Sequence, residues 1–385
     1  MVANGDGEHA DIEVDLEDQA VAPRIARSPK EPTSLERALH EVTHLPLRSW
    51  CRFCMMGRSK DAYHARLAEV DDVPRIGMDY MRVSEHGVNS TVEGAAGDVG
   101  ITMLVVKDFM YKSVWVYPVE GKGVTMAEWL PGMIRADMSM CGMDNSMLIV
   151  KSDQEPAIKE LQEEIARQRR QGGSVGTILE NSRVGDSSSN GRTERSIQEV
   201  GGMLRTLKFA LEARTGDVKI GLDHPIIPWM AKHGAAQICR FQVRASGRTS
   251  YQNIKGYACR DPMCEFGESV LFHPLKTNKE KRQKNALAER ALDGVWLGTD
   301  LKTSTNIIAT DSGVYFAGRV IRKSPSERWS RVAIDAIKGC PQEPVPGQGR
   351  DIPSFVRPEL RGEDRAGAPP AAVPTIPDEP EVRPM

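Results

Sequence analysis

Three carboxylates stand where a metal-dependent phosphoryl-transfer site could form. Asp79 lies in a strand-like run, Asp153 ends another such run, and Glu194 lies on the first turn of an amphipathic helix. They are 74 and 41 positions apart, but strand ends and an adjacent helix can converge in a mixed α/β sheet. Clustered carboxylates repel one another unless cations neutralise them, and such ligands suit Mg²⁺ or Mn²⁺. Two ions about 4 Å apart would support in-line polynucleotidyl transfer.

Each carboxylate also has a purely structural interpretation. Asp79 fits a buried side chain bonded to backbone, Asp153 fits a helix N-cap, and Glu194 fits a solvated residue. Asp108 competes for a strand-end role, but its place between two strand runs indicates turn chemistry. The spacing alone leaves both interpretations open.

A second group combines two imidazoles and two thiols. His40 and His44 are four residues apart on an expected helix that starts near Ser34, and Cys51 and Cys54 form a Cys-x-x-Cys turn. These four ligand types within fifteen residues can close a tetrahedral zinc site, which suits a segment with little core of its own. The alternative is a surface His pair with two buried Cys. A redox Cys-x-x-Cys would require a βαβ context, which is missing.

The elements around the carboxylates predict a mixed sheet with helices on its faces. Short β-branched and aromatic runs predict a three-strand meander, and the pattern then alternates helix, strand, helix, strand, helix. The expected elements are strands near 73–83, 101–109 and 113–119, a helix at 124–140 interrupted near Pro131, a strand at 146–153, a helix at 155–170, a strand at 176–181 and the helix of Glu194. A further helix is expected at 225–242. From Phe266 onward, short strands predict a small β-barrel.

Composition bounds the class of protein. The 385 residues exceed one typical domain, and the formal net charge of −2 conceals an acidic segment at 6–18 and a basic run at 276–284. No apolar run approaches the roughly twenty residues that span a bilayer. We therefore expect an intracellular protein with no membrane partner. Seven Cys, an odd number, argue against a secreted disulfide framework.

The expected organisation has six parts. They are an acidic disordered tail (1–30), a zinc-binding segment (31–66), an RNase H-like catalytic core (70–215), a helical extension (216–262), a small β domain (263–330) and a disordered Pro-rich tail (331–385).

Several motifs together resemble retroviral and especially copia-type retrotransposon integrases over roughly residues 37 to 325. They are the His/Cys set, GMDY at Asp79, VKSDQEP at Asp153, SSSNGRTERSIQ at Glu194 and the later CRFQVRASGRTSYQNIKG. The resemblance implies an RNase H-like core behind a zinc-binding domain and before a small β domain. It also implies Asp79, Asp153 and Glu194 as the triad that binds Mg²⁺ or Mn²⁺, and His40, His44, Cys51 and Cys54 as Zn²⁺ ligands.

The resemblance further implies DNA as the partner, both element ends and target, together with homo-oligomers and a nuclear location. Asn190 matches a polar position close to the DNA end. Family members often place Lys one and two turns beyond the glutamate, where this chain has Gln198 and Gly201. Arg205 and Lys208 lie further along the same helix, and phosphate contacts are expected from the basic run. The residues expected at DNA are Asn190, Arg205, Lys208, Lys279, Lys281, Arg282 and Lys284, with Arg319, Arg322 and Lys323 as further candidates.

The function expected from these features is metal-dependent processing of DNA ends followed by strand transfer. One alternative is a catalytically degraded or domesticated zinc- and DNA-binding module, and another is an RNase H-type nuclease. The nuclease interpretation leaves the His/Cys set and the β domain without a role. Because protease and reverse transcriptase motifs are not recognisable, we expect a polyprotein fragment or a separate reading frame.

Overall fold

A computed structural model describes most of the chain between residues 29 and 353. The described ranges are 29–58, 73–84, 87–89, 100–181, 191–275 and 289–353. All the helices and strands named below lie in one compact unit, Pro32–Met385, and the other unit is Met1–Glu31. Asn190, the loop before it and the basic run at 276–284 lie outside the described residues.

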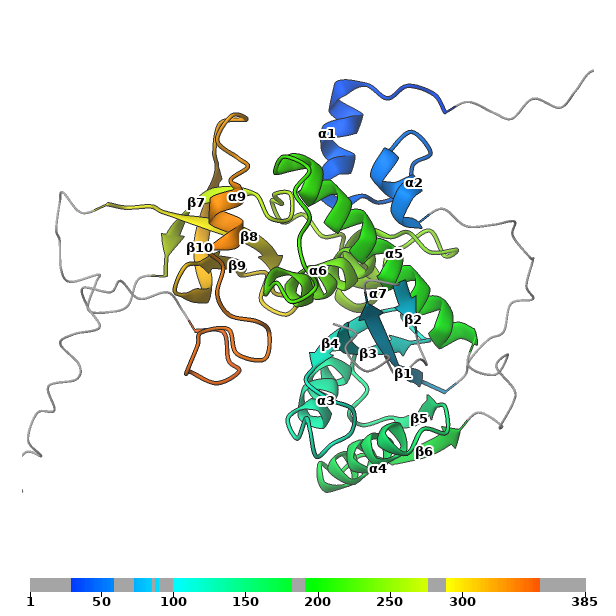
Figure 1. Cartoon of the computed structure of the whole chain (residues 1–385). Helices are drawn as coiled ribbons and strands as arrows, with labels where there is room; N and C mark the ends of the chain where they lie inside the picture. Colours follow the sequence, from blue (N-terminus) through cyan, green and yellow to red (C-terminus); the bar gives the residue numbers. More distant parts are fainter. Residues whose placement is uncertain are drawn as a thin grey trace, which may run out of the picture. The chain divides into compact units, whose positions relative to one another are not determined.

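The central element is a mixed sheet with the strand order β4-β3-β1-β5-β6, and a short β2 also pairs with β1 (Figure 1). Its strands are β1 (Arg75–Ser84), β2 (Gly87–Asn89), β3 (Gly100–Asp108), β4 (Val114–Val119), β5 (Met147–Ser152) and β6 (Gly176–Asn181). β1, β3 and β4 form the expected antiparallel meander, whereas β5 and β6 run parallel to β1. This order, with helices on both faces, is an RNase H-like core, as predicted.

Strand alternation divides the core of this sheet into two layers. One layer joins Met81, Val83 and Val105 to helices α5 (Gly191–Arg214) and α6 (Ile226–Phe241). The opposite layer joins Ile76, Met78 and Tyr80 to helices α3 (Leu130–Met140) and α4 (Pro156–Gln171). In β1 the odd-numbered side chains thus face α5 and α6, and the even-numbered side chains face α3 and α4.

Two short helices precede the sheet, α1 (Ser34–Thr43) and α2 (Arg52–Arg58). α1 begins at Ser34 as expected, but its capping residue is Thr33, which forms a capping box with Glu36. The helix ends at Thr43, so His44 lies at the C-cap in the left-handed conformation rather than inside the helix. Leu45 then enters the core layer shared with α5 and α6.

A closed barrel of four strands follows the core in the order β10-β7-β8-β9, as predicted for this region. The strands are β7 (Ser269–Pro274), β8 (Leu292–Thr299), β9 (Asn306–Thr310) and β10 (Gly313–Arg322), and the short helices α7 (Ser250–Lys255) and α9 (Arg331–Asp335) flank them in sequence. The buried His233 of α6 stacks edge-on against Trp296 of β8, with ring centroids 5.3 Å apart. Gly298, at φ 126°, leaves room for this ring, because a Cβ there would lie 2.6 Å from His233 Nδ1.

Two local expectations have clear outcomes. Pro131 does not interrupt a helix that begins at 124; instead it lies in the first turn of α3, which begins at Leu130, and its missing N–H costs nothing there. Asp108 performs the turn chemistry expected of it, because its carboxylate accepts hydrogen bonds from the N–H groups of Met110 and Tyr111 at 2.8 and 2.9 Å. No helix of the described chain has the length and apolar character needed to cross a membrane.

Candidate functional site

The register between β1 and β5 brings Asp79 and Asp153 to the same level of the sheet. The two strands are parallel, and Gly77 pairs with Lys151. Two residues further along each strand direction lie Asp79 and Asp153, and since side chains alternate, both fall on the face of Gly77. This is the face covered by α5 and α6, because Met81 and Val83 share its parity. Asp153 directly follows the last residue of β5, at the carboxyl end of the strand.

Glu194 approaches the same place from α5. It lies in the first turn of the helix, next to Thr193, which is completely buried. α5 approaches β1 closely at this point, and Gly77 permits it by lacking a side chain. A Cβ on Gly77 would collide with Thr193 Oγ1 and with the ring of Phe109, whose Cζ would be 2.8 Å away. Arg192 lies over that same ring at 5.3 Å, so the start of α5 is held against β1 and the β3–β4 turn.

The electrostatics of Asp79 reflect these neighbours. Burial first, and then the negative charges of Asp153, Glu155 and Glu194, raise the pKa of Asp79 to about 8, while a backbone hydrogen bond at Tyr80 opposes the shift. The side chain is only 4 % exposed, so its charge is poorly screened by water. A divalent cation would supply the neutralisation that these oxygen ligands otherwise obtain from a proton.

Glu155 is a neighbour of this group that sequence reasoning missed. It lies two residues after Asp153, forms an ion pair with Lys122 at 2.8 Å, and contributes to the raised pKa of Asp79. Its N–H donates to Asp153 Oδ1 at 3.2 Å, so Asp153 forms a local turn rather than capping α4, whose N-cap is Glu155. The Glu in VKSDQEP was the available signal.

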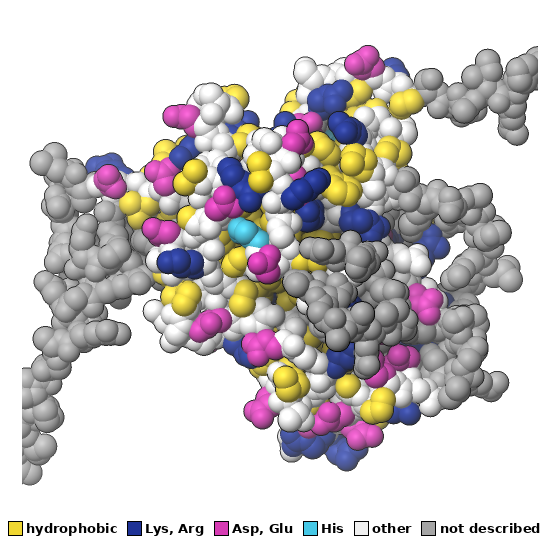
Figure 2. Space-filling model, in the orientation of Figure 1, with side chains coloured by type: hydrophobic (Ala, Val, Ile, Leu, Met, Phe, Trp, Pro, Cys, Tyr) yellow, Lys and Arg dark blue, Asp and Glu magenta, His cyan; other side chains and the backbone are white. Residues whose placement is uncertain are grey.

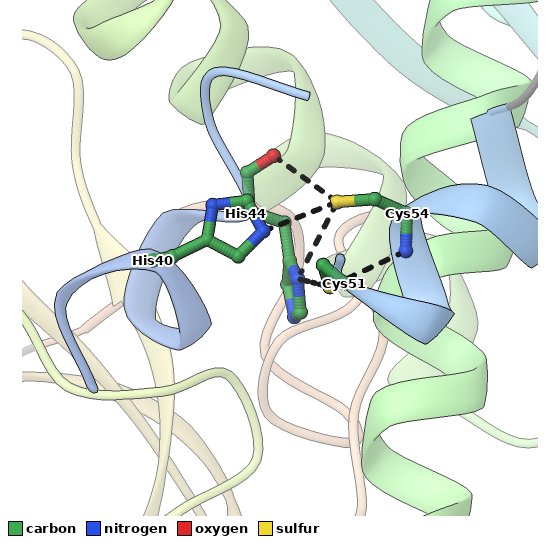
Figure 3. A group of neighbouring side chains, drawn as sticks. All are labelled: His40, His44, Cys51 and Cys54. Carbon is green, nitrogen blue, oxygen red and sulfur yellow. Dashed lines mark hydrogen bonds between the residues drawn. The ribbon is translucent and has the colours of Figure 1, made fainter. Parts of the chain in front are cut away.

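The structure brings His40, His44, Cys51 and Cys54 into one buried cluster (Figure 3). Their ligand atoms all lie within 4.8 Å of one another, and no other such group occurs in the ranges that the structure describes. Cys54 Sγ is 3.3 Å from His40 Nε2 and 3.8 Å from His44 Nδ1, and Cys51 Sγ is 3.6 Å from His44 Nδ1. Zn–S bonds of about 2.3 Å and Zn–N bonds of about 2.0 Å imply tetrahedral S···N edges of about 3.6 Å. The cluster therefore has the dimensions of a zinc site.

The hydrogen bond between the two thiols shifts their pKa values in opposite directions. The hydrogen bond from Cys54 lowers the pKa of Cys51, whereas the same interaction and then burial raise the pKa of Cys54. A thiolate is thus stabilised beside a thiol whose loss of a proton needs a cation. His40 Nδ1 is buried with no hydrogen-bond partner among the described residues, so its other nitrogen, Nε2, is the one turned toward sulfur.

Two residues of α5 that are expected at DNA contact other residues of this chain. Arg205 Nε donates to the carbonyl oxygen of Gly57 at 3.2 Å, and Lys208 forms an ion pair with the buried Glu212. Both line a cavity of about 360 Å³ together with Lys219 and an apolar floor that includes Leu204 and Ile220. Asn190, Lys279, Lys281, Arg282 and Lys284 lie outside the described residues.

Two of the further basic candidates, Arg322 and Lys323, are ion-paired, whereas Arg319 of β10 is exposed. Arg322 contacts the fully buried Glu268 at 2.7 Å, and Lys323 pairs with Asp293. On the coloured part of the face drawn in Figure 2, basic and acidic side chains are intermixed. The described residues of this face therefore form no single large basic surface.

Comparison with protein-family models and with curated proteins yields no match. The chain is similar to solved retroviral structures. One is a chain of the simian T-cell lymphotropic virus intasome in complex with a regulatory subunit of PP2A, with 12% identity, 71% of this chain and 88% of that chain covered, and a TM-score of 0.34. Another is the BIV integrase catalytic core, with 13% identity, coverage of 47% and 93%, and a TM-score of 0.30. A third is the HTLV-2 integrase catalytic core in complex with magnesium, with 16% identity, coverage of 46% and 93%, and a TM-score of 0.30.

Proposed function

We propose that this chain is an integrase of the copia retrotransposon type, which processes DNA ends and joins them to target DNA. The observation that carries the proposal is the register of β1 and β5, with Asp79 and Asp153 at one level and α5 held above them. The RNase H-like strand order and the His/Cys cluster support it.

In this mechanism Asp79, Asp153 and Glu194 would hold Mg²⁺ or Mn²⁺. When bound, such ions neutralise charge at a phosphodiester and activate the attacking oxygen. In the first step water attacks the phosphorus near a DNA end, and the 3′-oxygen leaves and takes up a proton as a free 3′-hydroxyl. In the second step that 3′-hydroxyl loses its proton and attacks a target phosphodiester, whose own 3′-oxygen leaves and is protonated. Because its pKa is raised to about 8, Asp79 would lose a proton on binding a cation below that pH. Glu194 is oriented by the contact between Thr193 and Gly77.

His40, His44, Cys51 and Cys54 hold Zn²⁺ in a structural role in this proposal, since four protein ligands leave no open position for substrate. The partners that belong to it are DNA and further copies of this chain, in a nuclear setting. Phosphate contacts come from Asn190, Arg205, Lys208 and the run containing Lys279, Lys281, Arg282 and Lys284.

The test is cleavage and joining on a branched DNA duplex that mimics the joined product, with Mg²⁺ or Mn²⁺. We expect Asp153→Asn and Glu194→Gln each to lower the rate at least about a hundredfold, because each removes a ligand worth several kcal/mol in the transition state. Glu164→Gln on the outer face of α4 is the matched control, since Glu164 pairs only with its helix neighbours Arg167 and Gln168. Joining that survives Asp153→Asn, or cleavage of RNA in a hybrid without DNA joining, would contradict the proposal.

A further inference from the structure

The His/Cys cluster is built into α2, and α2 is packed directly on α5. Gly57 in the last turn of α2 lies against the backbone of α5, so a Cβ there would be 2.7 Å from Thr206 N and 3.0 Å from Gly202 O. The contact is reciprocal, because a Cβ on Gly202 would lie 2.9 Å from Arg58 Cγ and 3.2 Å from Gly57 O. Two glycines thus allow the two helix backbones to touch.

Polar contacts reinforce this glycine contact on both sides. Arg205 of α5 donates to Gly57 O at 3.2 Å, and Arg58 of α2 donates to the carbonyl oxygen of His44 at 2.8 Å. At the far end of α5, Arg214 pairs with Glu41 of α1 at 2.6 Å. The His/Cys segment, which comprises α1 and α2, therefore contacts α5 at two separate places along the helix.

α5 is one uninterrupted helix of 24 residues. Glu194 is eight residues from Gly202, or roughly 12 Å along the axis at 1.5 Å per residue. A shift of the helix at Gly202 therefore moves the carboxylate of Glu194 relative to Asp79 and Asp153, which are attached to the sheet. The same helix carries both the contact with α2 and the third acidic residue.

The His/Cys segment has little hydrophobic core of its own. α1 and α2 have 10 and 7 residues, which is too short for an isolated helix to be stable in water. Leu35 and Leu39 of α1 are 68 % and 65 % exposed, so they add little buried area. Its order depends on Leu45, on the contacts with α5 and on the four-ligand cluster, whose metal binding free energy is folding free energy.

We infer that the metal-loaded His/Cys segment is a positioning clamp for α5: it holds the Gly57–Gly202 contact and thereby fixes Glu194 against Asp79 and Asp153. Gly57 and Gly202 are positioning residues in this arrangement. The inference rests on the proposed function, because it concerns the assembly of the same acidic site. It also explains why residue 202 is glycine inside a helix, since any side chain there would collide with α2.

The experiment uses the full chain loaded with zinc and measures Mn²⁺ affinity by electron paramagnetic resonance, together with hydrogen exchange of residues 191–214. We expect Gly57→Ala to keep one bound zinc, to weaken Mn²⁺ binding about tenfold and to speed exchange in α5. Gly132→Ala in α3 is the matched control, because a Cβ there meets nothing within 4 Å. It should leave Mn²⁺ affinity and α5 exchange unchanged.

If Gly57→Ala loses zinc or fails to fold, Gly202→Ala repeats the test with the cluster itself untouched. Unchanged Mn²⁺ affinity and α5 exchange in a zinc-loaded Gly57→Ala or Gly202→Ala protein would overturn the clamp while leaving the integrase proposal intact. Wild-type protein that binds no Mn²⁺ beyond its zinc would instead contradict the proposed function, and the clamp with it. Removing zinc from wild type with a chelator should reproduce the exchange change of Gly57→Ala.

Discussion

Asp79 is buried beside three acidic residues, so whether its carboxyl group is protonated decides the charge of the site. Its pKa is raised to about 8, first by burial and then by Asp153, Glu155 and Glu194. The unfolded side chain titrates near 3.8. Between these values the native state binds more protons than the unfolded state, so the free energy of unfolding falls as pH rises from about 4 to 8.

We predict that Asp79→Asn stabilises the metal-free protein near pH 8 by about 1–3 kcal/mol, because it removes a charge that burial and repulsion disfavour. The gain should shrink toward pH 4, because the native wild-type side chain is then protonated and carries no buried charge. Saturating Mg²⁺ should reverse the order, since only wild type retains the full ligand set. Thermal unfolding across this pH range, with and without Mg²⁺, measures both effects. A variant no more stable than wild type at pH 8 would show that the repulsion at Asp79 is unimportant.

Where helix α6 packs against the barrel, His233 is a second group whose protonation affects stability. Burial, and then the charge of Arg240, lower the pKa of His233 to about 3. Gln237 lies within hydrogen-bond distance of its ring at 3.0 Å, and Phe266 and Trp296 enclose it. The imidazole is thus held neutral in the contact between helix and barrel.

Because the folded pKa of His233 lies below its unfolded value of 6.5, the unfolded state binds more protons between pH 6.5 and 3. Stability is therefore fully present above pH 6.5 and is lost as pH falls. We predict that His233 alone costs about 2 kcal/mol between pH 7 and pH 5. His233→Gln should be less stable at pH 7 but should show a flatter pH dependence in denaturant unfolding. Parallel pH profiles for the two proteins would mean that His233 is not the acid-sensitive group.

The elements themselves follow from local sequence patterns more closely than their contacts do. Alternation and β-branched runs are sufficient for the meander and for β5, which ends just before Asp153, since each strand's signal lies within its own residues. The ligand set at His40 and Cys54 was likewise predictable from short spacing. The contact of Gly57 with Gly202 was not, because a close approach between residues so distant in sequence leaves no local signal. Gly201, the neighbour of Gly202, stands out in the sequence only because, with Gln198, it breaks an expected basic pattern.

At the scale of the whole molecule, Arg214 at the end of α5 connects three parts of the chain. Its Nη2 lies 2.6 Å from Glu41 of α1 and 3.3 Å from Glu265, which precedes the barrel, and its guanidinium lies over the ring of Trp329 at 5.6 Å. Glu265 also pairs with Arg322 of β10. One cation therefore holds two carboxylates from different parts against the helix that carries Glu194.

We predict that Arg214→Ala lowers the free energy of unfolding by about 1–3 kcal/mol, a range between exposed and buried ion pairs because these side chains are partly exposed. Part of the loss is repulsion between Glu41 and Glu265 once the arginine is gone. Burial already raises the pKa of Glu265, with Arg214 opposing that shift, so the variant's carboxyl should titrate higher. Adding Glu41→Gln to Arg214→Ala should therefore recover some stability, whereas Glu41→Gln alone should destabilise.

Denaturant unfolding of the four proteins in this cycle gives the coupling between Glu41 and Arg214 directly. The same samples test whether the parts unfold together, because losing the shared cation should broaden the thermal transition or divide it in two. A coupling near zero with an unchanged, single transition would mean that α1, α5 and the barrel are joined by their apolar contacts alone. Since Arg214 and Gly202 are on one helix, a divided transition in Arg214→Ala would also leave the Gly57–Gly202 contact as the main connection between the His/Cys segment and α5.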